Sequence, residues 1–90
     1  MKVKYANSFV RDLKKLKSRK VGAMVLALVE AAKVATSSST LGDVAKLTDY
    51  EDCYRIRVRD HRVGVYMQGD RIEFVRVLHR KEFYRLFPPR

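Results

Sequence analysis

The sequence predicts an α+β domain in which a strand and two helices precede a three-stranded antiparallel sheet. Apolar residues recur at helical spacing in the first half of the chain, and the period changes to two from Cys53 onward. Short polar links separate the segments of the second half, and such links are typical of the turns in an antiparallel meander. The chain has 90 residues, of which 47% are hydrophobic, which suffices for one domain with a single small core; we assign residues 1–90 to it.

The first half of the chain is expected to form a short strand and then a helical hairpin. Lys2–Tyr5 alternates as a strand does, and Asn7–Ser8 is a suitable helix cap. Apolar spacing predicts helices over about 8–17 and about 21–32. The short link between them indicates an antiparallel pair. The second helix is apolar almost all round, so it is either buried on two sides or partly left for a partner.

The second half is expected to supply the sheet. Strands are predicted near residues 53–59, 62–68 and 71–78, with turns at Asp60–His61 and Gly69–Asp70. Such short links make an antiparallel meander, and the two helices should cover one of its faces. Two further segments should lie against this body: the sheet-edge residues Val44, Ala45 and Leu47, and a short C-terminal helix or tail that carries Phe83, Leu86 and Phe87 and ends at Pro88–Pro89.

The charge of the chain indicates a polyanionic partner. The formal net charge is +10. Residues 53–90 carry ten basic and four acidic side chains, and nine of those ten cations are arginine, whereas eight of the ten in residues 1–52 are lysine. Arginine concentrated on strands favours planar or phosphate recognition, so a nucleic acid is the expected partner. The alternative is a basic surface that serves only solubility.

The composition of the chain disfavours disulfide-linked, zinc-binding and membrane proteins. Cys53 is the only cysteine, so no intrachain disulfide forms, and one thiol with two histidines makes a structural zinc site unexpected. Cys53 should be a small buried residue at the entrance of a strand. No apolar run is long enough for a bilayer and the N-terminus lacks a signal-peptide pattern, so we expect a cytoplasmic protein without membrane contact.

An arginine row is the first candidate functional feature. Arg55, Arg57 and Arg59 alternate with apolar residues, so they should share one face of the sheet. Arg62 begins the next strand and should lie close to them. A guanidinium group matches two phosphate oxygens at once, which suits this face to RNA. The alternative is a solvated face that prevents aggregation.

Titratable groups at the end of the last strand complete the candidate site. His79 is followed by Arg80 and Lys81 and then by Tyr84, so an imidazole and a phenol should emerge beside the arginines. His61 is interpreted as a surface residue in a turn. This set can support metal-free RNA cleavage, in which the ribose 2′-OH attacks the adjacent phosphate. Because no group of acids resembles a two-metal site, we expect no metal and no other cofactor.

Two stretches of the sequence resemble the RelE family within the RelE/ParE superfamily of toxins. They are Y-R-I-R-V-R-D-H-R-V-G-V-Y at Tyr54–Tyr66 and V-R-V-L-H-R-K-E-F-Y at Val75–Tyr84. Size, element order and basic charge agree with that family. The resemblance implies a RelE-like fold and a toxin–antitoxin endoribonuclease that cuts mRNA, commonly in the ribosomal A site. It also implies a neighbouring antitoxin; an acidic amphipathic helix and an added strand would suit a +10 chain with an apolar helix pair.

The resemblance also implies roles for individual residues. Arg62 and Arg80 would stabilise the charged phosphate, and His79 or Tyr84 would transfer protons. The RNA would be held by Arg55, Arg57, Lys81 and Arg59. Some relatives have lysines at positions 55 and 57, where a lysine can act as a base; arginine stays protonated, so the base role moves to His79 or to Asp43.

Two other functions remain open on the sequence. A ParE-like toxin poisons DNA gyrase by binding and cuts nothing, and it shares the fold. A non-catalytic RNA-binding relative would retain RNA without forming product. The conjunction of the arginine row with an imidazole and a phenol favours the nuclease.

Overall fold

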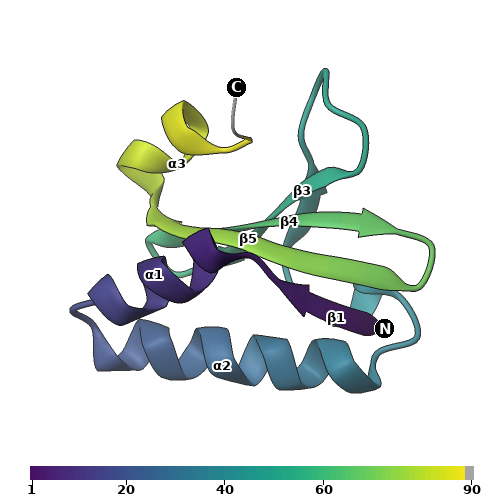
Figure 1. Cartoon of the computed structure of the whole chain (residues 1–90), viewed down its shortest axis with the longest axis horizontal. Helices are drawn as coiled ribbons and strands as arrows, with labels where there is room; N and C mark the ends of the chain where they lie inside the picture. The colour runs from purple at the N-terminus through teal and green to yellow at the C-terminus, as the bar shows by residue number, and fades with distance from the viewer. Residues whose placement is uncertain (89–90) are drawn as a thin grey trace.

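The computed structural model describes residues 1–88 and shows a five-stranded sheet between helices (Figure 1). In chain order the elements are β1 (Lys2–Tyr5), α1 (Asn7–Lys15), α2 (Arg19–Val34), the 3-10 turn η1 (Ser38–Thr40), β2 (Val44–Lys46), β3 (Cys53–Val58), β4 (His61–Gln68), β5 (Arg71–His79) and α3 (Arg80–Leu86). The sheet order is β1-β5-β4-β3-β2. The α+β fold and the meander β3-β4-β5 are confirmed.

Two features of the sheet were not predicted. β1 joins the sheet at its far edge, parallel to β5, with Lys2 paired to Arg71 and Tyr5 to Phe74. β2 adds a fifth strand antiparallel to β3, where only an edge contact was expected. The expected C-terminal helix is present as α3, and it lies on the face of the sheet opposite α1 and α2 (Figure 1).

The helix α1 covers the part of the β5 edge that β1 leaves open. The Ser8 hydroxyl donates a hydrogen bond to the carbonyl of Val75, and the Asp12 carboxylate accepts one from the backbone N–H of Val77 at 3.1 Å. The predicted cap by Asn7–Ser8 is therefore wrong. The N-cap is Ala6, whose methyl side chain cannot form a hydrogen bond, and the Ser8 hydroxyl is used on β5.

Alternation along the strands separates two apolar cores. One core lies between the sheet and the helices α1 and α2, and includes Phe9, Val25, Ile56, Val63 and Phe74. The other lies under α3 and includes Cys53, Val75, Leu78, Phe83 and Phe87. The prediction that Cys53 is buried at a strand entrance is confirmed.

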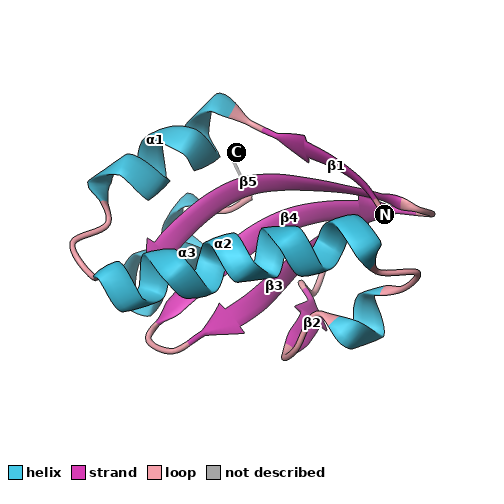
Figure 2. Cartoon of the chain, turned by 90° about the horizontal axis from the view of Figure 1, so that it is seen from below, coloured by secondary structure: helices cyan, strands magenta, loops and turns pink. Residues whose placement is uncertain are grey.

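The helix α2 runs across the underside of the sheet (Figure 2). Its inner residues, such as Val25 and Ala32, are buried, whereas Leu26 is 56% exposed and Val34 is 83% exposed. Part of its apolar surface is thus left uncovered within this chain, which was one of the two possibilities that the sequence left open. Among residues 1–88 no helix is long and apolar enough to cross a membrane.

The packing of α3 depends on a glycine in β4. The ring of Phe87 lies so close to Gly64 that a Cβ at this position would be 2.7 Å from the ring carbon Cγ. Phe87 also packs against Phe83, with ring centroids 5.3 Å apart, and against Tyr66 at 5.7 Å. The absence of a side chain at Gly64 therefore lets the end of α3 dock on the sheet.

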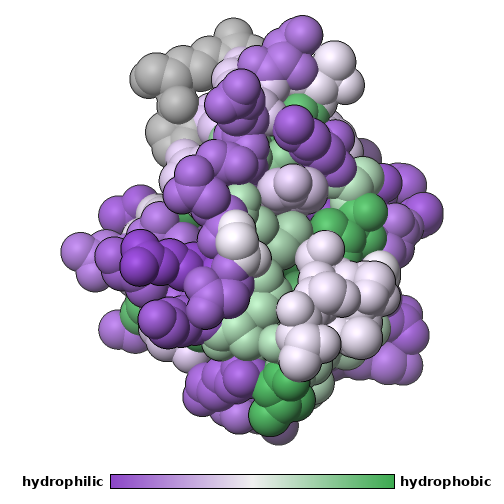
Figure 3. Space-filling model, turned by 90° about the vertical axis from the view of Figure 1, so that its right-hand side faces the viewer, coloured by the Kyte–Doolittle hydropathy of each residue, from purple (hydrophilic) through white to green (hydrophobic). Residues whose placement is uncertain are grey.

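The two ends of the sheet differ in character. The end that carries the β4–β5 turn, seen in Figure 3, has a strip of near-neutral and apolar residues between hydrophilic ones. At the opposite end the α1–α2 link, the β3–β4 turn and the β5–α3 junction come together (Figure 1). We call this second end the basic end, because the elements that meet there carry Lys14, Lys15, Lys17, Arg19, Lys20, Arg59, Arg62, Arg80 and Lys81.

Candidate functional site

The basic end is built by backbone pairing between the β3–β4 turn and the β5–α3 junction. His61, the first residue of β4, pairs with His79, the last residue of β5. The backbone N–H of Arg80 donates to the carbonyl of Asp60 at 2.8 Å, which fixes the start of α3 against the turn. Residues far apart in sequence are thus held on the shared frame of two strands.

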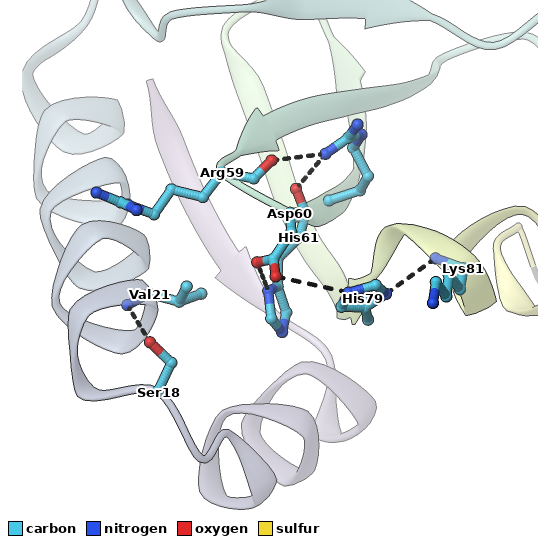
Figure 4. A network of polar contacts seen from close by, with 8 residues as sticks. Ser18, Val21, Arg59, Asp60, His61, His79 and Lys81 are labelled. Carbon is cyan, nitrogen blue, oxygen red and sulfur yellow. Dashed lines mark hydrogen bonds and ion pairs between the residues drawn. The ribbon is translucent and has the colours of Figure 1, made fainter.

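A three-residue polar network lies at this junction (Figure 4). His61 Nδ1 is 2.8 Å from Asp60 Oδ1, and His79 Nε2 is 3.5 Å from Asp60 Oδ2. The two imidazole rings meet edge to face, with centroids 5.5 Å apart. The hydrogen bond from His61 is the main cause that lowers the pKa of the exposed Asp60 carboxyl, so the carboxylate form is favoured here.

His79 occupies the N-cap of α3. Its Nδ1 accepts a hydrogen bond from the backbone N–H of Lys81 at 3.1 Å, while Nε2 faces Asp60 (Figure 4). Both ring nitrogens therefore have partners. That His79 transfers a proton stays a prediction.

The histidines and the arginines lie on different faces of the sheet. His61 pairs with Val58, whose side chain belongs to the core under α1 and α2, so both histidines are on that side. Arg62 pairs with Leu78, whose side chain belongs to the core under α3. We expected His79 to emerge beside the arginines, and it does lie at the same end of the sheet. Its side chain is on the opposite face, however, because successive residues of β5 alternate between the two faces.

The arginine row has two members on β3. Arg55 and Arg57 point to the α3 face, and Arg57 stands directly opposite Arg62 on β4. Asp43 lies between them: its Oδ1 is 3.1 Å from Arg55 Nη1 and its Oδ2 is 4.0 Å from Arg57 Nη1. Like charges directly opposite on neighbouring strands repel, so the pair of Arg57 and Arg62 is suited to an anion between them.

The placement of Arg59 in this row is wrong. The strand ends at Val58, and Arg59 is in the two-residue turn with a φ of 55°. Its side chain runs toward α2 rather than over the α3 face (Figure 4). Its carbonyl accepts a hydrogen bond at 3.0 Å from Nη1 of Arg62, which also donates to the carbonyl of His61 at 2.9 Å. Arg59 thus holds Arg62 by its backbone and adds its charge to the basic end.

One arginine of β5, Arg76, is held in an ion pair and does not contribute to the basic surface. Arg76 forms a two-pronged ion pair with Asp12 of α1, with Nε 2.7 Å from Oδ2 and Nη2 3.2 Å from Oδ1. The side chain of Asp12 is 7% exposed and that of Arg76 is 18% exposed. This pair joins α1 to the sheet, and the sequence had not singled out Asp12.

The remaining predicted residues lie along α3. Arg80 and Lys81 are exposed in its first turn. Tyr84 is 55% exposed and lines a cleft of about 400 Å³ beside Arg55, Tyr50 and other residues of β2, the β2–β3 loop and the chain end. Tyr84 is therefore grouped with Arg55 rather than with His79.

A second and larger cleft lies between α1, β5 and the start of α3. Its volume is about 590 Å³, and both histidines line it, together with Lys15 and Lys17. Within residues 1–88 no group of three potential metal-ligating side chains is arranged to hold an ion. The side chain of His61 is 16% exposed and opens into this cleft. The sequence signal for it was Asp60 immediately before a histidine at the start of a strand.

Comparisons with known proteins define the class of this chain. A family model described as the ParE toxin of type II toxin–antitoxin systems, parDE, matches residues 3–84. The chain therefore belongs to the ParE/RelE family of toxins from type II toxin–antitoxin systems, as its two characteristic stretches had indicated.

Individual relatives place it on the RelE side of that family. Toxin RelE3 from Methanocaldococcus jannaschii is 39% identical over 89 residues, which is 98% of this chain and 100% of the relative. A chain of the RelB–RelE antitoxin–toxin complex from Methanococcus jannaschii is 35% identical, with a TM-score of 0.82 over 94% of this chain and 99% of that chain. The RelE–RelB complex from Pyrococcus horikoshii OT3 has the same fold, with a TM-score of 0.71 at 22% identity; it covers 91% of this chain and 97% of that chain.

Proposed function

We propose that this toxin is a metal-independent endoribonuclease that cleaves mRNA, in the ribosomal A site. The observation that carries the proposal is the basic end, where fixed cations on one face of the sheet and two imidazoles on the other lie at the same end of the strands. Cleavage by 2′-OH attack needs a proton acceptor and fixed positive charge near the phosphate, and no metal. A chain that only bound a protein target would not need an imidazole pair held by a carboxylate at this end of the sheet.

The arginines have distinct places in this proposal. Arg57 and Arg62, opposite each other on β3 and β4, are positioned to hold one phosphate between them. Arg80, whose backbone N–H is hydrogen-bonded to the Asp60 carbonyl, would stabilise charge that develops on the phosphate. The neighbouring nucleotides would be held by Arg55, Arg59 and Lys81, with Tyr84 able to stack on a base or to donate from its phenol.

Expression in bacteria tests the proposal. Wild type and Arg62→Ala are induced, and primer extension on a reporter mRNA locates new 5′ ends. Arg71→Ala is the matched control, because Arg71 is an exposed arginine of β5 at the opposite end of the sheet. We expect cuts within translated codons for wild type and the control, and about 100-fold fewer for Arg62→Ala. Intact mRNA in arrested wild-type cells would refute the proposal.

Poisoning of DNA gyrase is a second candidate function, because the matching family model is described as a ParE toxin. A ParE-like gyrase poison would arrest growth with DNA damage and without RNA cleavage. The same induction experiment therefore separates the two functions, because DNA breaks and mRNA cuts are scored in the same cells.

We also propose that an acidic antitoxin neutralises this toxin. The complexes from M. jannaschii and P. horikoshii contain a RelB partner. In this chain a shallow apolar groove of about 270 Å³ lies between α1 and α2, lined by exposed residues that include Tyr5, Val10 and Leu26. An amphipathic helix with an acidic outer face fits both this groove and the charge of +10.

Co-expression with the neighbouring gene product tests this partner. We expect the two chains to purify together, and Leu26→Glu to weaken the complex at least about tenfold, because it places a charge in the groove. Val34→Glu is the matched control, since Val34 is an exposed apolar residue of the same helix that does not line the groove. A neighbouring product that is not retained by wild type would contradict the proposal.

A further inference from the structure

We infer that His61 is the general base of the cleavage reaction and that Asp60 is its positioning residue. The inference rests on the proposed ribonuclease function and names a residue that the family resemblance did not. An imidazole accepts a proton only at a ring nitrogen whose lone pair is free and reaches the substrate.

His79 does not meet this requirement in the structure. Its Nδ1 lone pair accepts the backbone N–H of Lys81 at 3.1 Å, so in the neutral ring the proton is on Nε2. That Nε2 faces the carboxylate of Asp60 at 3.5 Å. Neither nitrogen of His79 is left to take a proton from RNA.

His61 meets the requirement. Its Nδ1 is 2.8 Å from Asp60 Oδ1, and a carboxylate can only accept, so the proton of the neutral ring is on Nδ1. The lone pair is then on Nε2, which makes no hydrogen bond within residues 1–88, and the ring lines the 590 Å³ cleft. A carboxylate that fixes the tautomer of a histidine in this way is the device that hydrolases use to orient a base.

Two other carboxylates, Asp43 and Asp12, are held in ion pairs with arginines. Asp43 is engaged by Arg55 and Arg57, and Asp12 by Arg76. The cleft around His61 is faced by Asp12, Lys15, Lys17, His79 and Glu82, besides Asp60. The lysines would attract a phosphodiester into the cleft.

Arg62 is the arginine next to the proposed base along the chain. This arginine follows His61 directly, and its Nη1 is 2.9 Å from the His61 carbonyl. Although the two side chains leave the strand on opposite faces, both are at the end of the sheet, around which an RNA strand can pass. A nucleotide whose 2′-OH meets Nε2 of His61 would have its phosphate among the cations of the basic end, including Lys15 and Lys17 of the cleft.

Nε2 of His61 takes the proton of the 2′-OH, and O2′ forms a bond to phosphorus. The P–O5′ bond breaks with its electron pair on O5′, which takes a proton from water. The products are a 2′,3′-cyclic phosphate and a 5′-hydroxyl, and the imidazolium, stabilised by Asp60, returns its proton to solvent.

The test compares substitutions that preserve the hydrogen bonds of each histidine. In His61→Asn the amide can still donate to Asp60 but offers no basic nitrogen, whereas in His79→Asn the side-chain oxygen can still cap α3. We expect His61→Asn to lower the single-turnover cleavage rate at least about 100-fold and His79→Asn less than about tenfold. Glu73→Gln serves as the unaffected control, because Glu73 is on β5 away from the end of the sheet where His61 and His79 pair.

Two further readouts distinguish a base from a structural residue. Binding of a 2′-deoxy analogue should be equal in wild type and His61→Asn, and the fall of the wild-type rate at acid pH should be absent from the residual rate of His61→Asn. Asp60→Asn should lower the rate less than His61→Asn does and change the pH profile. NMR of ¹⁵N-labelled imidazoles should show the proton of neutral His61 on Nδ1 and that of neutral His79 on Nε2.

Distinct results refute the inference and the function on which it rests. A wild-type protein that cleaves RNA while His61→Asn cleaves equally well, or while His79→Asn loses as much as His61→Asn, overturns the inference alone. The opposite tautomers overturn it as well. A wild-type protein that cleaves no RNA, free or on ribosomes, overturns both.

Discussion

The close approach of Gly64 to Phe87 gives a prediction whose size can be worked from the structure. In Gly64→Ala the new Cβ would be 2.7 Å from Cγ of Phe87 and 2.8 Å from Cδ1 and Cδ2. Carbon atoms in contact are ordinarily about 3.5–4.0 Å apart, so the ring must move by close to an ångström. Phe87 is 1% exposed and is stacked among Phe83 and Tyr66, so the movement disturbs the whole core under α3.

The expected cost lies between two limits. Extra methyl groups forced into a packed core cost about 1–3 kcal/mol, and complete loss of a buried phenylalanine costs about 3–5 kcal/mol. We expect the ring to shift rather than leave, hence a loss of about 2 kcal/mol in the free energy of unfolding. For a domain of this size that corresponds to a fall in Tm of roughly 8–16 °C.

Urea and thermal unfolding followed by circular dichroism measure this cost. Gly22→Ala is the control: nothing lies within 4 Å of a Cβ there, and inside α2 alanine should stabilise by about 0.5–1 kcal/mol. With Phe87→Ala already present, the cost of Gly64→Ala should fall below about 0.5 kcal/mol. A cost that is absent in wild type, or equal in both backgrounds, would refute the reasoning.

Three further predictions concern buried and titratable groups. Asp12→Ala should cost about 3–5 kcal/mol, because it leaves Arg76 unpaired, and Asp12→Ala/Arg76→Met should recover part of that; urea unfolding measures both. Burial raises the pKa of the Cys53 thiol, so a thiol reagent should label native protein slowly at pH 8 and quickly in urea; fast native labelling would contradict this. Because the folded pKa of Asp60 is lowered from its ordinary 3.8, its stabilising contribution is present above about pH 4 and lost below. The stability difference between wild type and Asp60→Asn should therefore vanish as pH falls below about 4, and a difference that grows there would be contrary to expectation.

The local elements could be predicted from the sequence because each depends on spacing alone. The helices α1 and α2 and the meander followed from periods of 3.6 and 2, and their bounds differ from the expected ones by one or two residues. The partner of β1 could not be predicted, because four alternating residues indicate a strand but not the strand beside it. Asp12 likewise becomes important only once α1 lies against the open edge of β5.

The sequence predicted which residues lie near the candidate site better than it predicted which face of the sheet each one occupies. Alternation was extended one residue too far at Arg59, where the chain turns with a positive φ. The turn was placed at Asp60–His61 and is at Arg59–Asp60, so His61 is the first residue of a strand instead of a loop residue. A shift of one residue exchanges the faces of a strand, which is why the pairing of His61 with His79 was missed.

The parallel pairing of β1 with β5 has a consequence for how the chain folds. Residues 2–5 find their partners at 71–74, so the sheet is completed by a contact between the two extremes of the domain. Contacts of such large sequence separation are slow to form, because a long loop must close first. During synthesis the first strand must remain unpaired until most of the chain has been made. The basic end is assembled by the same late segment, so neither part of the fold is complete in a chain that stops before β5.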